Sequence, residues 1–445
     1  MAKIGKIYAN IDYEDEYVQP LLLAALKARL PPELLLFVNE ASSPPLLDSK
    51  LLQWRQYEKI DFEHLLEHTQ TNLANGYVIR KALIRKHYLS TTVSHWLTKH
   101  PESVLKDHVK PSVEFEVDYA EFLDDALIEA FELKESWARN EGREPSEREW
   151  WILKPGMSDR GQGIRLFSTE EELTAIFEEW DPPSDDEDED EDQAEHSGGD
   201  EPKGVEHMDN GDSNGNGVIT SQLRHFVAQP YIHPPLLLPD PHPSAGRKFH
   251  IRTYVLAVGA LRVYVYKPML ALFAGQPYTS PGHSAQSSSP NDNLASHLTN
   301  TCLQSGEREG SVHAFWSLPS HLDSLPTSQD WRQDVFDQIR KVTGKVFEAA
   351  ARSMSIHFQP LPNAFEVFGL DFMVDAEGAA WLLEVNAFPD FAQTGGELQD
   401  LIAGLFEEVV EVAVKPFFGL QSDTAAAEGS EGKMVQVLDI DLGRR

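Results

Sequence analysis

Residues 366–390, EVFGLDFMVDAEGAAWLLEVNAFPD, constrain the fold more than any other part of the chain. They predict two strands, EVFGLDFMV and WLLEVN, joined by a tight turn at residues 377–378. Asp371 and Glu384 each lie six residues from that turn, so they should face each other, and Asn386 shares the face of Glu384. Two carboxylates and an amide oxygen among apolar neighbours suit a hard cation, so the hairpin predicts a Mg²⁺ site. The alternative is an exposed hairpin that carries ordinary surface acids.

A second hairpin is predicted in WILKPGMSDRGQGIRLF, residues 151–167. The strand WILKP leads into a loop with Gly156, Gly161 and Gly163, and the chain returns as IRLF. Such a loop lets backbone N–H groups approach phosphates, and Lys154 would add a positive charge. It is not a Walker loop, because no Gly-Lys-Ser/Thr leads into a helix. Taken alone, the segment could equally be a flexible turn.

A third hairpin is predicted in RKFHIRTYVLAVGALRVYVYKP, residues 247–268, with its turn at residues 259–260. Alternation of side chains puts a row of cations and one histidine on one face of the first strand, and apolar residues on the other. This face could meet phosphates, or its arginines could clamp carboxylates in bidentate fashion. It could also be the solvated side of a sheet, with His250 as a structural histidine. The polar faces are Lys248, His250 and Arg252 on the first strand, and Arg262, Tyr264 and Tyr266 on the second.

Hairpins interleaved with helices predict an α+β fold with antiparallel sheets rather than a doubly wound parallel fold. A chain of 445 residues is expected to form two or three packed subdomains. Apolar residues recur at helical spacing over residues 331–354 and 397–414, which predicts two helices packed on the core.

The formal charge of −34 is concentrated in one segment: residues 181–212 hold fifteen Asp or Glu and one Lys. The wider segment 181–217 has too few apolar residues to fold and is expected to be a disordered acidic insertion. The acidic balance argues against direct nucleic-acid binding. One cysteine, no apolar leader and no run long enough to cross a membrane predict a soluble, cytoplasmic protein.

Together these segments resemble the ATP-grasp fold and, more narrowly, the tubulin–tyrosine ligase-like family, as a divergent fungal member. The matching text is WILKP-S-RGQGI, QPYI-PLLL with KFHIR, HLTN at 297–300, and FEVFGLDFMVD-WLLEVNAFP. The resemblance implies antiparallel sheets with flanking helices in three subdomains. The expected boundaries are 1–75 for an N-terminal subdomain, 76–232 for a lid-like subdomain with the acidic insertion, 233–420 for a C-terminal subdomain with the Mg²⁺ site, and 421–445 for a disordered tail.

In this family ATP lies between the lid-like and C-terminal subdomains, and the resemblance implies cofactors ATP and Mg²⁺. Implied phosphate contacts are Lys154, Lys81 in IRKAL, and the loop residues Ser158, Arg160, Gly161 and Gly163. The implied adenine-side hinge is Gln229, Tyr231 and Ile232, with Lys248 as a further nucleotide-binding lysine and His250 beside the ribose. Implied metal ligands are Asp371, Glu384 and Asn386, and implied carboxylate clamps are Arg252 and Arg262. Among these, Lys154, Arg252, Arg262 and Glu384 are the expected catalytic residues.

The resemblance implies a ligase that adds an amino acid, with tyrosine as first candidate, to a protein carboxylate such as the α-tubulin C-terminus through an acyl phosphate. Glutamate or glycine addition is a close variant. The other class of function is a degenerate scaffold with little turnover, since His250 replaces the family's usual Asp and Pro230 a common lysine. The implied partners are a protein acceptor, with tubulin as candidate, and a free amino acid. The implied locations are microtubules or cytoplasmic RNA granules.

Overall fold

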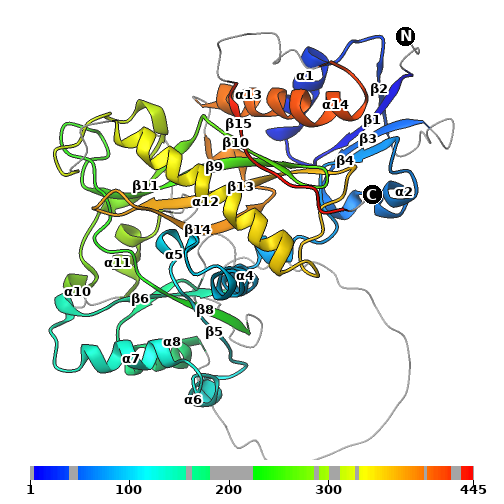
Figure 1. The fold of residues 1–445 in the computed structure, drawn as a ribbon. Helices are drawn as coiled ribbons and strands as arrows, with labels where there is room; N and C mark the ends of the chain where they lie inside the picture. Colours follow the sequence, from blue (N-terminus) through cyan, green and yellow to red (C-terminus); the bar gives the residue numbers. More distant parts are fainter. Residues whose placement is uncertain are drawn as a thin grey trace, which may run out of the picture.

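The computed structural model describes residues 5–39, 49–156, 163–180, 224–284, 290–299, 311–325, 330–394, 398–421 and 432–443. They form three sheets (Figure 1): a small parallel one near the N-terminus, a large antiparallel one in the centre, and a four-stranded antiparallel one at the far end. The antiparallel sheets predicted from the three hairpins are therefore present. The parallel sheet was not predicted.

The N-terminal sheet has the strand order β2-β1-β3-β4, and each pair is parallel. Helix α1 (Val18–Arg29) follows β1 and buries Val18, Leu22, Ala25 and Leu26, one stripe at helical spacing. That stripe packs in a core shared with α13 and the central sheet. The strands are β1 (Ile7–Asp12), β2 (Leu35–Val38), β3 (Lys50–Arg55) and β4 (Asn72–Ala74).

The lid-like subdomain is built on a four-stranded sheet of order β5-β8-β6-β7. The predicted hairpin of residues 151–167 is β6 and β7, which pair Leu153 with Arg165. Helices α7 and α8 bury their apolar stripes in the core of this sheet. The strands are β5 (Val113–Glu116), β6 (Trp151–Pro155), β7 (Arg165–Phe167) and β8 (His225–Pro230), and the helices are η2 (Ala120–Phe122), α6 (Leu123–Ala126), α7 (Phe131–Asn140), η3 (Pro145–Glu147) and α8 (Glu170–Trp180).

The central sheet has seven strands and is organised around β9 (Arg247–Val258). One edge of β9 pairs with β11 and β10, and the other edge pairs with β13, which pairs in turn with β14. The remaining strands are β10 (Arg262–Tyr266), β11 (Leu270–Pro277), β12 (Val312–Ala314), β13 (Phe365–Val374), β14 (Ala380–Ala387) and β15 (Met434–Asp439). Both predicted hairpins of residues 247–268 and 366–390 are therefore formed.

Helix α12 (Trp331–Ser353) crosses one face of this sheet, as Figure 1 shows. All five residues of the predicted apolar stripe lie on this helix and are buried: Val335, Ile339, Val342, Val346 and Ala350. The second predicted helix is α13 (Gln399–Val409), continued by a π-helical turn (Val410–Val414) and α14 (Lys415–Phe417). The other helices are η1 (Tyr57–Lys59), α2 (Phe62–Glu67), α3 (Lys81–Ile84), α4 (Lys86–Lys99), α5 (Leu105–His108), α10 (Pro281–Ser284), α11 (Pro290–His297), η5 (Phe315–Ser317) and η6 (Phe391–Thr394).

The two faces of β9 bury different cores, because successive side chains point to opposite sides. One face packs under α12, and the other packs towards the N-terminal subdomain. On that second face polar and apolar side chains are segregated along the strand. Lys248, His250 and Arg252 come first, followed by Tyr254, Leu256 and Val258. This face of β9 thus carries polar side chains in its first half and side chains of the hydrophobic core in its second half.

The expected disordered tail of residues 421–445 is wrong over part of its length. Residues 434–439 form β15, which pairs in antiparallel fashion with β10. Partly buried side chains of this strand, among them Val435 and Val437, pack against the core that contains α12. The acidic insertion predicted over residues 181–217 lies outside the described residues. No helix among the residues described here is both long and apolar enough to span a membrane.

Candidate active site

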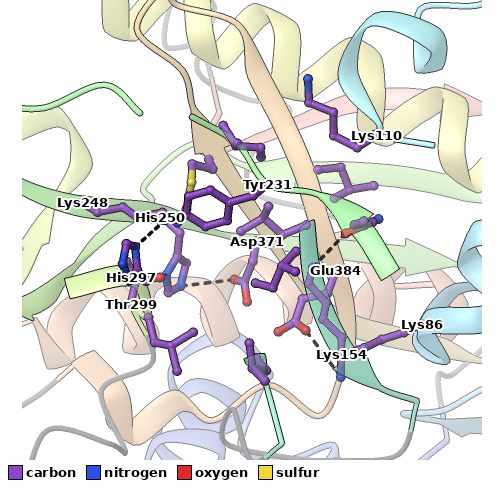
Figure 2. A pocket seen from close by; sticks show the side chains of 18 of the residues that line it. Lys86, Lys110, Lys154, Tyr231, Lys248, His250, His297, Thr299, Asp371 and Glu384 are labelled. Atoms are coloured by element: carbon purple, nitrogen blue, oxygen red, sulfur yellow. Dashed lines mark hydrogen bonds and ion pairs between the residues drawn. The ribbon is translucent and has the colours of Figure 1, made fainter. Parts of the chain in front are cut away.

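A pocket of about 170 Å³ opens between the lid-like sheet and the central sheet. Side chains from both sheets converge on it, as Figure 2 shows. The lid wall comes from β6 and β8, and the central wall from β9, β13 and β14. Ten of the predicted site residues line it: Lys154, Gln229, Tyr231, Ile232, Lys248, His250, Arg252, Asp371, Glu384 and Asn386.

The predicted facing of Asp371 and Glu384 is confirmed, since they are direct partners across β13 and β14. The expected turn at 377–378 is longer, because Val374 pairs with Ala380, and a register shift after Asp371 restores the pairing. Asn386 donates its amide N–H to Glu384 Oε1 at 3.1 Å and to Asp371 Oδ2 at 3.4 Å. The three oxygen-bearing side chains therefore form one cluster.

Arg252 closes this cluster from the neighbouring strand. Its Nε donates to Asp371 Oδ1 at 2.6 Å and its terminal nitrogen to Asp371 Oδ2 at 3.0 Å, with both side chains buried. Burial would lower the pKa of Arg252, but the charge of Asp371 outweighs it and raises that pKa above its usual value. Gly369 makes the close approach possible, because a Cβ there would lie 3.3 Å from Arg252 Cδ and 2.8 Å from Pro389 Cβ.

Glu384 is the more open carboxylate, with 31% of its side chain exposed. Lys86, at the start of α4, places its Nζ 3.7 Å from Glu384 Oε2. Burial would raise the pKa of Glu384, but the charges of Lys86 and Lys154 outweigh it and lower that pKa to about 2. This carboxylate is therefore ionised at neutral pH.

Lys154 lies on the lid wall, where its Nζ donates to Gln229 Oε1 at 2.9 Å. Gln229 is held in turn by a hydrogen bond from its Nε2 to Ser112 Oγ at 2.8 Å. Burial lowers the pKa of Lys154 to about 8, and the nearby Glu384 only partly opposes this. Within the described residues, no carboxylate lies within ion-pair distance of this ammonium group.

Lys248 has a similar environment at the start of β9. Its Nζ donates to the hydroxyl of Tyr231 at 2.7 Å and lies 4.1 Å from the centre of the tyrosine ring. That hydroxyl also contacts His297 Nδ1 at 2.9 Å. Burial lowers the pKa of Lys248 well below its usual value, and the charge of Lys154 adds to the effect. In the described part of the chain this lysine, too, has only neutral partners.

His250 stands between these groups, as Figure 2 shows. Its Nδ1 is 2.6 Å from Thr299 Oγ1, whereas its Nε2 has no hydrogen-bond partner among the described residues. That Nε2 lies 3.7 Å from Asp371 Oδ1, which is too long for a hydrogen bond. Burial lowers the pKa of His250, so the imidazole is neutral at pH 7. A buried, unpartnered ring nitrogen is an available contact for a ligand.

Apart from Lys110, the remaining lining of the pocket is apolar. It is suited to a flat, weakly polar group such as a nucleobase, because apolar walls with a few convergent polar groups characterise ligand pockets. The backbone N–H of Tyr231 is already used, since it donates to Trp150 O at 2.8 Å. The apolar lining residues are Ile152, Ile164, Pro230, Ile232, Leu272, Leu298, Met373, Leu382 and Leu383.

Two predicted site residues lie elsewhere. Lys81 is exposed, and its Nζ lies 6.0 Å from the ring centre of Tyr88 rather than in the pocket. Arg262 pairs with Val258, six residues along β9 from Arg252, which is roughly 20 Å away. Its guanidinium therefore does not share the pocket with Asp371.

The glycine-rich loop is only partly described. Ser158, Arg160 and Gly161 lie outside the described residues. Gly163 has φ of +70°, a left-handed conformation that favours glycine, and the next residue, Ile164, lines the pocket.

Four polar residues that line the pocket, and Ser112 behind it, were not among the predicted sites. Lys86 lies in the second of two IRK triplets in IRKALIRK, whereas the predicted phosphate contact, Lys81, lies in the first. His297 and Thr299 belong to the HLTN segment, which was recognised without assigning residue roles. Nothing in the sequence marked Lys110, which lines the pocket, or Ser112, which reaches it through Gln229.

The side chains present fit both ATP and Mg²⁺. Two buried ammonium groups with only neutral partners match the negative charge of a polyphosphate. Asp371 and Glu384 offer carboxylate oxygens to a hard cation, and the amide of Asn386 would contribute its oxygen after a half-turn about its terminal bond. Bound Mg²⁺ would offset phosphate charge at this hairpin.

Comparisons with known proteins agree with this arrangement. A sequence model of the tubulin–tyrosine ligase family matches residues 72–421. A probable tubulin–tyrosine ligase of Schizosaccharomyces pombe is 46% identical over 414 residues, covering 93% of this chain and 92% of the relative. A probable tubulin–tyrosine ligase of Saccharomyces cerevisiae, PBY1, is 41% identical over 436 residues, which is 95% of this chain but only 54% of the relative.

A solved structure is similar over nearly the whole chain. It is the C-terminal domain of Pby1 from K. lactis, described as an ATP-grasp enzyme that interacts with the mRNA decapping enzyme Dcp2. The TM-score is 0.67 with 36% sequence identity, covering 98% of this chain and 99% of that one. The fold is thus that of the ATP-grasp proteins, which use ATP. Within that class, the chain belongs to the tubulin–tyrosine ligase family, whose members are carboxylate–amine ligases.

Proposed function

We propose that this chain is an ATP- and Mg²⁺-dependent ligase that joins an amino acid to a protein carboxylate. One observation carries the proposal: two buried lysines without carboxylate partners, Lys154 and Lys248, share one pocket with the oxygen cluster of Asp371, Glu384 and Asn386. A core built only for stability would not hold two lysines in this state, because burying an unpaired charge is costly. A polyphosphate and its divalent cation would complement both groups at once.

The residues would divide the work between nucleotide and metal. Lys154 and Lys248 would hold the phosphates, and the apolar slot beside Tyr231 would take the adenine. The hairpin carboxylates would hold Mg²⁺, with Arg252 fixing the orientation of Asp371. His250 would offer its Nε2 to the ribose or to a phosphate oxygen. Positioning and charge stabilisation would then supply the catalysis, without a protein nucleophile.

The reaction would follow the order expected for acyl phosphates. A carboxylate oxygen of the acceptor attacks the γ-phosphorus, and the bond to the β-phosphate oxygen breaks to release ADP. The amine of the incoming amino acid then attacks the acyl carbon, forming an amide, losing a proton and releasing phosphate. Arg252 is tied to Asp371, so an incoming carboxylate would depend on the pocket's lysines unless that pair opened.

Tyrosine as the amino acid and the α-tubulin C-terminus as the acceptor are the first candidates, because the relative at 46% identity is called a probable tubulin–tyrosine ligase. Glutamate or glycine addition remains the variant to test. We propose a cytoplasmic location, at RNA granules because the solved relative interacts with a decapping enzyme, or at microtubules if tubulin is the acceptor.

A scaffold with little turnover is the second candidate. Two observations favour it: the neutral His250 at a position where the family usually has Asp, and the reported interaction of the solved relative with Dcp2. Such a scaffold would bind a decapping enzyme and would use the pocket for nucleotide sensing or not at all.

Calorimetry with Mg²⁺-ATP separates the two. If the chain is a ligase, ATP binding should depend on Mg²⁺ and should fall strongly in Lys154→Met and Glu384→Gln. Circular dichroism should show that both variants stay folded. Incubation with ATP, acceptor extract and one radiolabelled amino acid at a time should then label a protein band with the wild type and not with Glu384→Gln. Full labelling by Glu384→Gln would show that the metal assignment is wrong, and binding without labelling by any amino acid would favour the scaffold.

A further inference from the structure

The outer surface of the lid-like subdomain exposes apolar side chains. Of the eight large apolar residues exposed among the described residues, four lie within residues 119–131. Their exposed fractions run from 48% to 64%. These four residues are Tyr119, Phe122, Ile128 and Phe131. Single exposed apolar residues are ordinary, but a concentration of this kind marks an interaction surface.

The segment that carries them is firmly attached. Leu123, Leu127 and Leu133 are at most 2% exposed and belong to the core of the lid-like sheet. The rings of Tyr119 and Phe122 contact each other edge-on, 6.3 Å between centres. The exposed side chains are therefore presented on a fixed backbone, which lowers the entropy lost on binding a partner.

The same segment is strongly acidic. Residues 118–132 hold six Asp or Glu and no Lys or Arg. The nearest cations are engaged: Lys134 Nζ donates to Ile128 O at 3.3 Å, and Arg224 pairs with Asp118 at 3.2 Å. We call residues 118–132 the acidic-apolar face.

A groove of about 550 Å³ runs beside this face. One side is formed by Ser112, Val113 and Glu114 of the β5 segment, and β5 is an edge strand of its sheet. The opposite side comes from residues 125–132. Four carboxylates and Ile128 line it, and among the described residues no Lys or Arg does; the carboxylates are Glu114, Asp125, Glu129 and Glu132. Burial raises the pKa of Glu114, although hydrogen bonds such as that from the Thr91 hydroxyl partly oppose the shift.

We propose that the acidic-apolar face and its groove dock an extended segment of a partner protein that is rich in Lys or Arg and alternates them with apolar residues. The cations would neutralise the four carboxylates, and the apolar side chains would cover Phe122, Ile128 and Phe131. An extended segment could also add to β5, which is an edge strand in the described part of the chain. This docking surface is separate from the catalytic pocket and does not depend on the proposed ligase activity.

Charge selects this occupant over others. The chain's own segment 181–212 holds fifteen acids, so the face would repel it. Nucleic acid and acidic peptide tails would be repelled in the same way. A second copy of this chain is disfavoured as well, because the formal charge of the chain is −34.

The test uses three fluorescein-labelled peptides of twelve residues in a fluorescence anisotropy assay with the full chain. One alternates Lys with Val, one alternates Lys with Ser, and one alternates Glu with Val. We expect the Lys/Val peptide to bind at least tenfold more tightly than either of the others, with affinity that falls as salt rises. The double variant Glu129→Lys/Glu132→Lys and the single variant Phe131→Ser should each weaken Lys/Val binding at least fivefold.

Matched controls keep the result interpretable. Glu102→Lys reverses an exposed charge elsewhere, and Ile356→Ser removes an apolar side chain that is 75% exposed at a distant site. Both should bind the Lys/Val peptide as the wild type does, and all variants should retain wild-type Mg²⁺-ATP binding. Equal binding of the three peptides, no binding of the Lys/Val peptide, or loss of binding in the control variants to the same extent would overturn the proposal. Self-association that Phe131→Ser abolishes, measured by light scattering, would do so too.

Discussion

Two regions of the pocket differ in how their charges are balanced. At the carboxylate hairpin of β13 and β14, Arg252 pairs with Asp371 at 2.6 Å and Lys86 lies 3.7 Å from Glu384. By contrast, Lys154 on β6 and Lys248 at the start of β9 contact only an amide oxygen and a phenol among the described residues. The charges of the carboxylate hairpin are thus paired before any ligand binds, whereas the two lysines have no carboxylate partner among these residues.

This difference predicts opposite effects on stability. Removing one member of a closed, buried pair leaves its partner uncompensated and destabilises the fold. Removing a buried lysine that has no counter-charge relieves a desolvation penalty and should stabilise it. Both kinds of substitution should nevertheless reduce the proposed activity. Their effects on stability should be opposite, so loss of activity can be distinguished from loss of folding.

Asp371→Asn should have the largest effect. It leaves the buried guanidinium of Arg252 without its counter-charge, which should lower the free energy of unfolding by about 3–5 kcal/mol. It also removes a proposed metal ligand, so Mg²⁺-ATP binding and ligation should be lost. Urea unfolding followed by circular dichroism measures the first effect, and calorimetry the second.

The double variant Asp371→Leu/Arg252→Met is the control for that pair. Replacing both charges by apolar groups should recover most of the lost stability, because no charge is left buried alone. Mg²⁺-ATP binding should remain lost. If Asp371→Asn is as stable as the wild type, Asp371 and Arg252 do not act as a closed, buried pair.

Lys154→Met should weaken ATP binding by about a hundredfold, since a charge-assisted contact to phosphate is lost. The free energy of unfolding of Lys154→Met should instead rise above that of the wild type. The pKa of Lys154 falls from 10.5 to about 8 on folding, so below pH 8 the charged form opposes folding by an amount on the order of 3 kcal/mol. Thermal unfolding at pH 7 should therefore show a higher midpoint for Lys154→Met than for the wild type. A lower midpoint would indicate that this lysine has a counter-charge.

The pH dependence of nucleotide binding follows from the same shift. Lys154 loses its charge as the pH rises through about 8, so ATP affinity should fall by up to about tenfold for each further pH unit. Binding should also take up protons near pH 8, because bound phosphate restores the charged form. Calorimetry in buffers of different ionisation enthalpy measures that uptake, and Lys154→Met should reduce it. Uptake that is unchanged in Lys154→Met would assign the titration to another group.

The sequence was informative where local pattern decides the structure. Alternation along β9 placed Lys248, His250 and Arg252 on one face, and alternation along β14 placed Asn386 on the face of Glu384. These two inferences need only strand periodicity, which the backbone imposes. The facing of Asp371 and Glu384 was expected from a two-residue turn, and it holds only because the register shift offsets a longer turn. The longer turn and the register shift that compensates for it could not be read from the residues.

Relations between distant segments were not readable from the pattern. Arg262 shares a strand face with Tyr264, but which residues lie opposite depends on how β10 pairs with β9, and that pairing puts Arg262 beside Val258. The parallel N-terminal sheet and the pairing of β15 with β10 are likewise contacts between segments far apart in sequence. Periodicity fixes a side chain's face and not its neighbours.

The two IRK triplets give the smallest and sharpest comparison, because the sequence alone cannot separate them. Lys86 lies 3.7 Å from Glu384, whereas Lys81 is exposed next to Tyr88. Lys86→Ala should raise the pKa of Glu384, since it removes a charge that holds that pKa low, and should weaken Mg²⁺-ATP binding three- to tenfold, an ion-pair-sized effect of about 1 kcal/mol. Lys81→Ala is the matched control and should stay within twofold of the wild type by calorimetry. The reverse ranking would place the second phosphate contact at Lys81 and would require the start of α3 to move when nucleotide binds.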